Sequence, residues 1–211
     1  MAPYRRKISL RLENAGCDRG GRPIVRGVTL GVTPGDAVQL FGANGAGKTS
    51  LLNLIAGLLR PAEGSLAWRV DKGGWEPQSP LDAIVYIGHE ACVKSALTAG
   101  ENMLIWAKTY GVQKAKQKDA VYGALTRVGM QECVDMRAGA LSAGQRRRVD
   151  VARAILAERE VWLMDEPAAA VDEKGAEMIG ALIAEHKERG GVAIIATHDA
   201  LSVTSRKLVI G

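Results

Sequence analysis

The chain has 211 residues, of which 47% are hydrophobic but only one is Phe, so its core must be built mainly from aliphatic side chains. The formal net charge of +5 suits phosphate ligands or an anionic surface and does not require nucleic acid. The three Cys residues are scattered with no Cys-x-x-Cys pair, which argues against a disulfide framework or a zinc site and favours a reducing compartment.

The sequence shows no membrane-targeting segment. Met1–Lys7 lacks the apolar stretch of a signal peptide, and no uncharged apolar run reaches the ~18 residues of a membrane span. We therefore expect a cytosolic chain that leaves any membrane crossing to other subunits.

The first part of the chain is predicted to be rich in β-strands. Val28–Val32 alternates between faces, Pro34–Asp36 forms a turn, and Ala37–Phe41 is an apolar run suited to a buried strand. Two further strands are expected at Ser65–Val70 and Ala83–Ile87, with a surface loop rich in Gly and Pro between them.

The apolar run that ends at Phe41 leads directly into a complete G-x-x-x-x-G-K-T phosphate loop, which predicts a nucleoside triphosphate ligand with Mg²⁺. The glycines let successive backbone N–H groups face the phosphates, and the following helix points its positive end at the same anion. Lys48 would supply a charge to the β- and γ-phosphates, and the Thr49 hydroxyl would bind the metal. The residues expected to bind ATP are Gly42, Ala43, Asn44, Gly45, Ala46, Gly47, Lys48, Thr49 and Ser50.

The pattern becomes helical between Thr98 and about Met136, opening with a capping box at Thr98-x-x-Glu101. Alternation of helices and strands then returns, which predicts an α/β fold with a parallel or mixed sheet. The expected elements are helices at 116–128, 142–158 and 173–189 and strands at 161–165, 192–196 and about 207–210. We expect one domain over residues 1–211, with a nucleotide-binding α/β core at 1–88 and 141–211 and a helical subdomain at about 89–140.

The apolar run Val161–Glu166 ends in two adjacent acids, Asp165 and Glu166. In phosphate-loop enzymes an acid at the end of a buried strand holds Mg²⁺, and Asp165 fits that role. A carboxylate directly after the metal acid can orient or deprotonate the attacking water, so we expect Glu166 to be the general base. The alternative is that both acids only cap the turn at Pro167.

A second candidate anion site lies at the start of the helix expected at 142–158. Ser142-x-x-Gln145 is a capping box, so local structure alone can explain these two residues. It does not explain Gly144, which costs a helix about 1 kcal/mol relative to Ala. A glycine beside a serine hydroxyl at a helix N-terminus can bind phosphate, and two phosphate sites for one triphosphate suggest that two copies share the nucleotide.

These motifs resemble, in order and spacing, those of the ATP-binding subunit of ABC transporters, over essentially the whole chain. The segments that carry the resemblance are Gly42–Thr49, Leu141–Gln145, Val161–Glu166, Ala170–Asp172 and Thr197–His198. A closer resemblance is to the heme-exporter branch of that family, which serves cytochrome c maturation. It is carried by Cys17–Arg19, Tyr86–His89, Val161–Glu166, the signature with Ala143 and the short C-terminus.

The resemblance implies a role for each motif residue. Glu166 is the catalytic carboxylate, Asp165 supports the metal, and His198 contacts the γ-phosphate and positions the water. From the residues alone, His198 could equally be a capping or core residue at a strand end. Asp172 is implied to lie in the loop that crosses the dimer. The residues implied to reach ATP held by the opposite subunit are Leu141, Ser142, Ala143, Gly144 and Gln145.

The sequence departs from the family pattern at three places. His89 stands where most members carry a glutamine that meets Mg²⁺, and its role as a metal ligand or as an exposed structural residue stays open. No aromatic residue for adenine stacking occurs in Gly16–Arg22, although such stacking is worth about 1–3 kcal/mol. We therefore predict weak base discrimination, with GTP competing for ATP. Ala169 replaces a common serine, so one hydrogen bond across the dimer is expected to be missing.

The resemblance implies a peripheral ATPase at the cytoplasmic face of the bacterial inner membrane, with ATP and Mg²⁺ as cofactors. Its implied partners are a second ATPase subunit and integral membrane permease subunits, and its implied work is heme export or heme release. We expect no nucleic-acid partner and no direct heme binding, because the Cys and His residues form no pair suited to heme. The alternatives are an exporter of other cargo (lipid, drug or peptide), an ATPase acting on nucleic acid or ribosomes, and a phosphate-loop kinase of metabolites.

Overall fold

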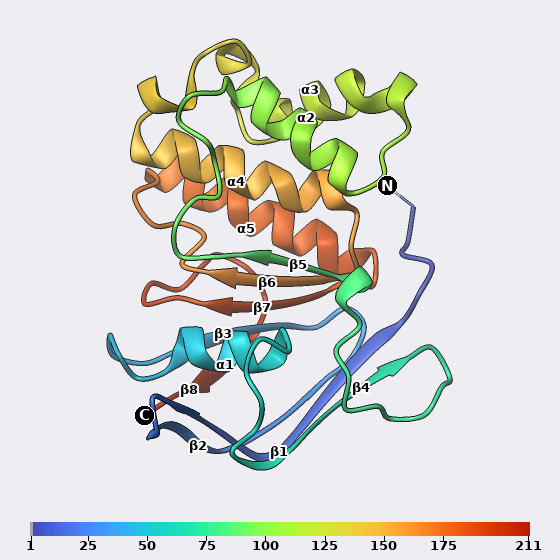
Figure 1. Cartoon of the computed structure of the whole chain (residues 1–211), viewed down its shortest axis with the longest axis vertical. Helices are drawn as coiled ribbons and strands as arrows, with labels where there is room; N and C mark the ends of the chain where they lie inside the picture. The colour runs from blue at the N-terminus through green and yellow to red at the C-terminus, as the bar shows by residue number, and fades with distance from the viewer. Residues whose placement is uncertain (1) are drawn as a thin grey trace.

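Two β-sheets of different kinds organise the computed structural model, which describes residues 2–211 (Figure 1). The antiparallel sheet has the strand order β2-β1-β4, and the parallel sheet has the order β5-β6-β7-β3-β8. The antiparallel strands are β1 (Ile8–Arg19), β2 (Arg22–Val32) and β4 (Glu63–Val70). The parallel strands are β3 (Ala37–Phe41), β5 (Ile84–Ile87), β6 (Val161–Asp165), β7 (Val192–Ala196) and β8 (Arg206–Val209).

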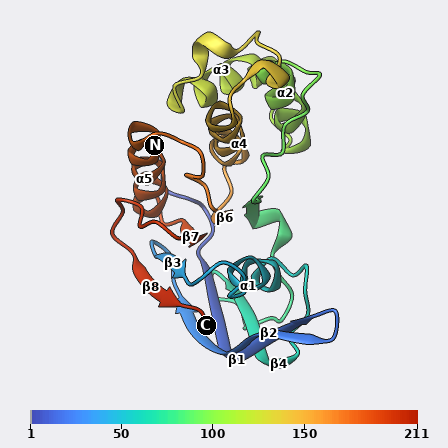
Figure 2. The ribbon, with the colours of Figure 1, turned by 90° about the vertical axis from the view of Figure 1, so that its left-hand side faces the viewer.

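The helices cover both faces of the parallel sheet. Helix α1 (Lys48–Ile55) lies between the two sheets, whereas α4 (Ala143–Ala157) and α5 (Glu173–Glu188) cover the opposite face (Figure 1). Helices α2 (Ala99–Thr109) and α3 (Gln117–Arg127) pack against α4, on the side away from the antiparallel sheet (Figure 2). These layers agree with the predicted α/β fold class, including the helical insertion and the N-terminal antiparallel portion. None of the helices in residues 2–211 combines the length and apolar character needed to cross a bilayer.

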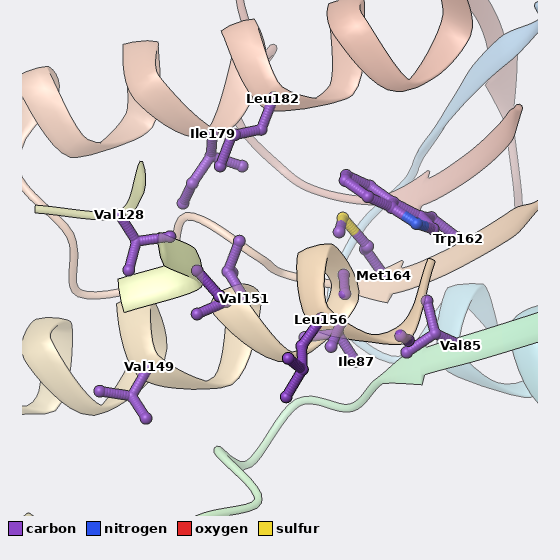
Figure 3. Packing of buried hydrophobic residues seen from close by; sticks show 14 of the residues in the cluster. Val85, Ile87, Val128, Val149, Val151, Leu156, Trp162, Met164, Ile179 and Leu182 are labelled. Carbon is purple, nitrogen blue, oxygen red and sulfur yellow. The ribbon is translucent and has the colours of Figure 1, made fainter. Parts of the chain in front are cut away.

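The two faces of the parallel sheet build two separate hydrophobic cores. In β6, Val161 and Leu163 point into the core shared with α1 and the antiparallel sheet. Trp162 and Met164 point into the opposite core, against α4 and α5 (Figure 3). This alternation follows from the two-residue period of a strand, and burial on both faces explains why β6 is apolar throughout.

Strand β1 was not identified individually from the sequence. Its pairing with β2 shifts register between Leu12 and Ala15, between Ala15 and Cys17, and again at Asp18. Such bulges interrupt the alternation of apolar and polar residues on which a strand prediction depends. The strand is recognisable mainly from the partners that it finds on either side.

Candidate functional site

The carboxyl ends of four parallel strands meet at one edge of the sheet, which is where ligands bind in open α/β folds. Strand β3 leads into the phosphate loop, β5 leads to His89, β6 ends at Asp165, and His198 follows β7. A cavity of about 290 Å³ opens there, lined by phosphate-loop residues together with His89, Asp165 and Glu166. The fold thus brings together motifs that are more than a hundred residues apart in sequence.

The phosphate loop has the backbone that its glycines predict. Gly47 caps α1 with a left-handed φ of 101°, and a Cβ there would come within 2.5 Å of Val25 Cγ2. The first turn of α1 carries no acidic residue and no side-chain cap, so its N–H groups are free to meet an anion. Lys48 is buried, and its Nζ donates to the Gly42 carbonyl at 2.7 Å, which holds the ammonium group against the loop.

Thr49 and Asp165 form the pair expected at a magnesium site. The Thr49 hydroxyl donates to Asp165 Oδ2 at 2.7 Å, and the Asp165 residue is 2% exposed. A hydroxyl and a carboxylate are hard oxygen donors, and Mg²⁺ is usually bound by one or two carboxylates together with substrate phosphates. The donor set therefore fits Mg²⁺.

Glu166 and His198 form a second pair at the ends of β6 and β7. His198 Nδ1 lies 2.9 Å from Glu166 Oε2, and His198 Nε2 lies 3.2 Å from Asp199 Oδ2. The hydrogen bond to Glu166, followed by the Glu166 charge, raises the pKa of His198 above its ordinary value. Glu166 also has a left-handed φ of 51°, a conformation that costs a non-glycine residue about 1–3 kcal/mol. The backbone N–H of Glu166 donates to the Ala196 carbonyl at 2.9 Å, which stabilises this strained turn.

The predicted capping box at the start of α4 is present. Ser142 Oγ accepts from the Gln145 backbone N–H at 3.1 Å, and Gln145 Oε1 accepts from the Ser142 N–H at 2.8 Å. Leu141 is buried, whereas Ser142 and Ala143 are exposed. None of the residues 141–145 lines the cavity that contains the phosphate loop of the same chain.

Gly144 has a local packing reason that sequence analysis missed. A Cβ on Gly144 would lie 2.4 Å from the Ala170 carbonyl oxygen, so the start of α4 approaches the loop after β6 closely. Phosphate binding is therefore not needed to explain this glycine.

Asp172 also has a local role. Its Oδ1 accepts from the Gly175 N–H at 3.1 Å as the N-cap of α5, and it forms an ion pair with Arg148 of α4. The side chain is exposed, which leaves it accessible to another subunit. Its role across a dimer stays a prediction.

A buried ion cluster on α4, consisting of Arg147, Asp150 and Arg153, was not anticipated from the sequence. Asp150 is 1% exposed; Arg153 Nε donates to its Oδ1 at 3.1 Å, and Arg147 Nη1 lies 3.6 Å from its Oδ2. Arg147 also extends to the backbone after β5, where it donates to the carbonyls of Gly88 and His89. The cluster therefore ties the helix that begins with Ser142 to the segment that carries His89 into the cavity. The sequence signal that could have revealed this cluster is the spacing of these charged residues, which places them on the side of the helix that faces the core.

The sequence profile of the ABC transporter family matches residues 25–169. The chain belongs to this family. It is 41% identical to the cytochrome c biogenesis ATP-binding export protein CcmA of Rhodopseudomonas palustris strain HaA2, over 96% of this chain and 98% of the relative. Proteins of the same name from Bradyrhizobium diazoefficiens (43%, over 92% and 94%) and Haemophilus influenzae (38%, over 90% and 88%) are also similar.

Solved structures of ABC ATPases share the fold. An ABC transporter ATP-binding protein from Pyrococcus furiosus has a TM-score of 0.82 and 25% identity, covering 96% of this chain and 97% of that one. The ADP-bound ATP-binding cassette MJ1267 has a TM-score of 0.72 and 27% identity, covering 92% and 82%. The predicted fold class is confirmed, and this member of the ABC family is an ATP-binding, ATP-hydrolysing protein.

Proposed function

We propose that this chain is the ATPase subunit of an ABC exporter that drives heme export or heme release in cytochrome c biogenesis. The ATPase part is supported by one observation: Lys48, the Thr49–Asp165 pair and Glu166 line a single cavity, and His198 contacts Glu166. The cytochrome c part is supported by relatives that carry this role in their names and are 37–43% identical over about nine-tenths of the chain.

The proposed reaction is hydrolysis of the γ-phosphate by water. Residues 42–50 hold the triphosphate through backbone N–H groups and Lys48. Mg²⁺, held by Thr49 and Asp165, would neutralise charge on the phosphate oxygens. Glu166 accepts a proton as the water oxygen attacks phosphorus and the bond to the ADP oxygen breaks, while His198 orients the Glu166 carboxylate and contacts the γ-phosphate.

The active state is proposed to contain two copies of the chain. Ser142 and Gly144, with Leu141, Ala143 and Gln145 around them, would face the γ-phosphate bound to the opposite subunit. This assignment is supported by the exposure of Ser142 and by the absence of residues 141–145 from the chain's own phosphate cavity. Asp172 would lie at the dimer crossing.

The proposed complex sits at the cytoplasmic face of the bacterial inner membrane, where the chain would bind peripherally to CcmB-, CcmC- and CcmD-like permease subunits. The α/β core at 1–88 and 141–211 would carry the nucleotide, and the helical subdomain at about 89–140 would be part of the same domain. We also propose that His89 responds to which nucleotide is bound. It lines the cavity, and its backbone carbonyl accepts a hydrogen bond from Arg147 of α4.

Glu166→Gln tests the ATPase part. The variant should bind Mg·ATP, hydrolyse it at least about a hundredfold more slowly, and accumulate as a nucleotide-bound dimer in size-exclusion chromatography with light scattering. Glu188→Gln, at the exposed end of α5, is the matched control and should behave as wild type. Hydrolysis by Glu166→Gln near the wild-type rate would show that Glu166 is not the base.

The cytochrome c part is tested separately in the source bacterium. Deleting the gene should abolish heme attachment to c-type cytochromes, measured by heme staining and reduced-minus-oxidised spectra. Wild type should restore attachment and Lys48→Ala should not. Normal cytochrome c in the deletion strain would refute this part while leaving the ATPase assignment intact.

A further inference from the structure

The connection from β7 to β8 carries His198 and has no regular structure of its own. The two strands are parallel and β3 lies between them, so residues 197–205 must cross the sheet to reach β8. A crossover between parallel strands usually contains a helix, which holds its own backbone in place. Residues 197–205 form neither helix nor strand. The position of His198 therefore depends on what holds this connection from outside.

Gln39 of β3 holds the middle of the connection. Its side-chain Oε1 accepts from the Leu201 N–H at 2.9 Å, and its Nε2 donates to the Leu201 carbonyl at 3.3 Å. Nε2 also donates to Ser205 Oγ at 2.7 Å. Because the Leu201 N–H can only donate, it fixes which way the amide points. The amide therefore pairs with both backbone groups of one residue, as a neighbouring strand would.

The polar character of Gln39 is explained by this connection. Gln39 is 1% exposed, and the neighbouring β3 residues Ala37, Val38 and Leu40 lie in the two hydrophobic cores. A buried amide costs free energy unless it is hydrogen-bonded, so an apolar side chain would suit this position if only packing mattered. The three hydrogen bonds of the amide go to residues 197–205.

Helix α5 contacts the same connection. A Cβ on Gly180 would lie 3.0 Å from the Ser202 carbonyl oxygen, so the helix backbone and the connection approach each other closely. Leu201 is buried in the core that also contains Ile183 of α5. The connection is thus held by the helix as well as by Gln39, and it has little room to shift while both contacts are intact.

His198 lies between two fixed points of the backbone. On one side, the Thr197 N–H donates to the Leu40 carbonyl at 3.1 Å, and the Thr197 hydroxyl donates to the Asp199 carbonyl at 2.6 Å. On the other side, Leu201 is held by Gln39. The His198 side chain itself is 59% exposed, so the position of its backbone, rather than packing around the ring, directs it toward Glu166.

We propose that Gln39 is a positioning residue that places His198 against Glu166. This inference rests on the proposed function, in which His198 orients the Glu166 carboxylate and contacts the γ-phosphate. Gln39 is not among the residues that line the nucleotide cavity, so it acts on hydrolysis through the connection. A displacement of about 1 Å that arises far from the reacting atoms can slow an enzyme by up to about a hundredfold.

Single-turnover hydrolysis of Mg·ATP by the full-length chain tests the proposal. Gln39→Met keeps an unbranched side chain and should lower the rate at saturating Mg·ATP about tenfold, because His198 loses its position. The half-saturating concentration should change less than about twofold, because the phosphate loop is untouched. Ser205→Ala removes one hydrogen bond, should have a smaller effect, and covers a failure of Gln39→Met to fold. In a His198→Ala background both substitutions should lose their effect.

Asn102 of α2 offers a matched control. It is 3% exposed, and its amide also pairs with the N–H and the C=O of one residue, Lys94, at 2.7 and 3.1 Å. Asn102→Leu should lower the urea midpoint about as much as Gln39→Met does. Any effect of Asn102→Leu on hydrolysis should be the same with and without His198. At fixed pH, the NMR signals of the His198 imidazole protons should shift in Gln39→Met and not in Asn102→Leu.

The outcomes separate a positioning role from a purely structural one. Equal fold losses for Gln39→Met in the wild-type and His198→Ala backgrounds would make Gln39 a structural residue and overturn the proposal. Full hydrolysis by Gln39→Met, or unchanged His198 signals in that variant, would also overturn it. Hydrolysis by His198→Ala at the wild-type rate would instead refute the proposed role of His198 on which the inference rests.

Discussion

Glu166 combines backbone strain with a defined partner. Its left-handed φ points the carboxylate away from the direction that β6 would otherwise give it, and His198 Nδ1 meets it at 2.9 Å. Strained residues persist only where the surrounding structure holds them, and they concentrate at functional sites. The strain is therefore an independent reason, besides the motif, to place chemistry at Glu166.

Measuring the pKa of His198 tests the contact between His198 and Glu166 directly. The pKa of His198 is raised in the folded protein, mainly by the hydrogen bond to Glu166. The ion pair between protonated His198 and Glu166 is therefore fully formed below about pH 6.5, and it is lost as the pH rises through the raised pKa. Glu166→Gln should lower the His198 pKa toward about 6.5, followed by NMR of the imidazole protons. Asp199→Asn, which removes a weaker contributor, should lower it less. A larger shift from Asp199→Asn would contradict the structure.

At the scale of the element, α4 has two functions that can be separated. Its N-terminus presents the capping box of Ser142, and its interior holds the ion cluster around Asp150. The same helix therefore connects a surface proposed to face a second subunit with the segment that ends at His89.

Two equivalent helix caps allow the role of Ser142 to be isolated. Thr98 heads the same kind of capping box on α2, away from the nucleotide cavity. Ser142→Ala and Thr98→Ala should each cost about 1 kcal/mol of unfolding free energy in urea titrations. Only Ser142→Ala should also slow ATP hydrolysis, by about tenfold or more, because it alone would remove a hydrogen bond to a charged phosphate. Equal effects on hydrolysis would leave Ser142 a purely structural cap.

The buried cluster should matter far more than a surface ion pair. Asp150→Ala leaves two desolvated guanidinium groups without their carboxylate and should cost about 3–5 kcal/mol of unfolding free energy. Glu13→Ala breaks the exposed pair with Arg11, where Nε and Oε1 are 3.3 Å apart, and should cost less than about 1 kcal/mol. Similar costs for the two variants would mean that water reaches Asp150.

At the scale of the whole molecule, the N-terminal segment is fastened to the far side of the parallel sheet by a buried histidine. His186 Nε2 lies 3.1 Å from the Val192 carbonyl oxygen, which can only accept, so Nε2 carries the proton and Nδ1 accepts from the Tyr4 hydroxyl at 3.0 Å. The ring also stacks on Trp162, with centroids 4.0 Å apart. Burial lowers the pKa of His186 to about 3, so the folded protein holds it neutral.

This histidine predicts sensitivity to acid. In the unfolded chain His186 takes up a proton near pH 6.5, whereas in the folded chain it stays neutral until about pH 3. The free energy of unfolding therefore falls as the pH drops between these two values. Between pH 6.5 and 4 the loss should approach about 3 kcal/mol. His186→Gln cannot titrate, so its unfolding free energy in urea should fall less over this range. Parallel pH curves for the two proteins would show that His186 is not the group responsible.

Local patterns predicted most elements, because strand alternation, capping boxes and the phosphate loop depend on residues close together in sequence. They failed at β1, where bulges break the alternation, and at the Arg147–Asp150–Arg153 cluster, where charged side chains occupy buried positions. The reason for Gly144 was also out of reach, because its neighbour Ala170 becomes a neighbour only after folding.

The sequence by itself determined the ligand class, since the spacing within residues 42–49 suffices to specify backbone N–H groups and a lysine around phosphate. It also determined which acids stand at the end of β6. Only the tertiary structure decided that Asp165 meets Thr49, that Glu166 meets His198, and that Gln39 meets Leu201. These contacts join separate strands and the connection after β7, and their geometry is set by how the sheets pack rather than by any local spacing.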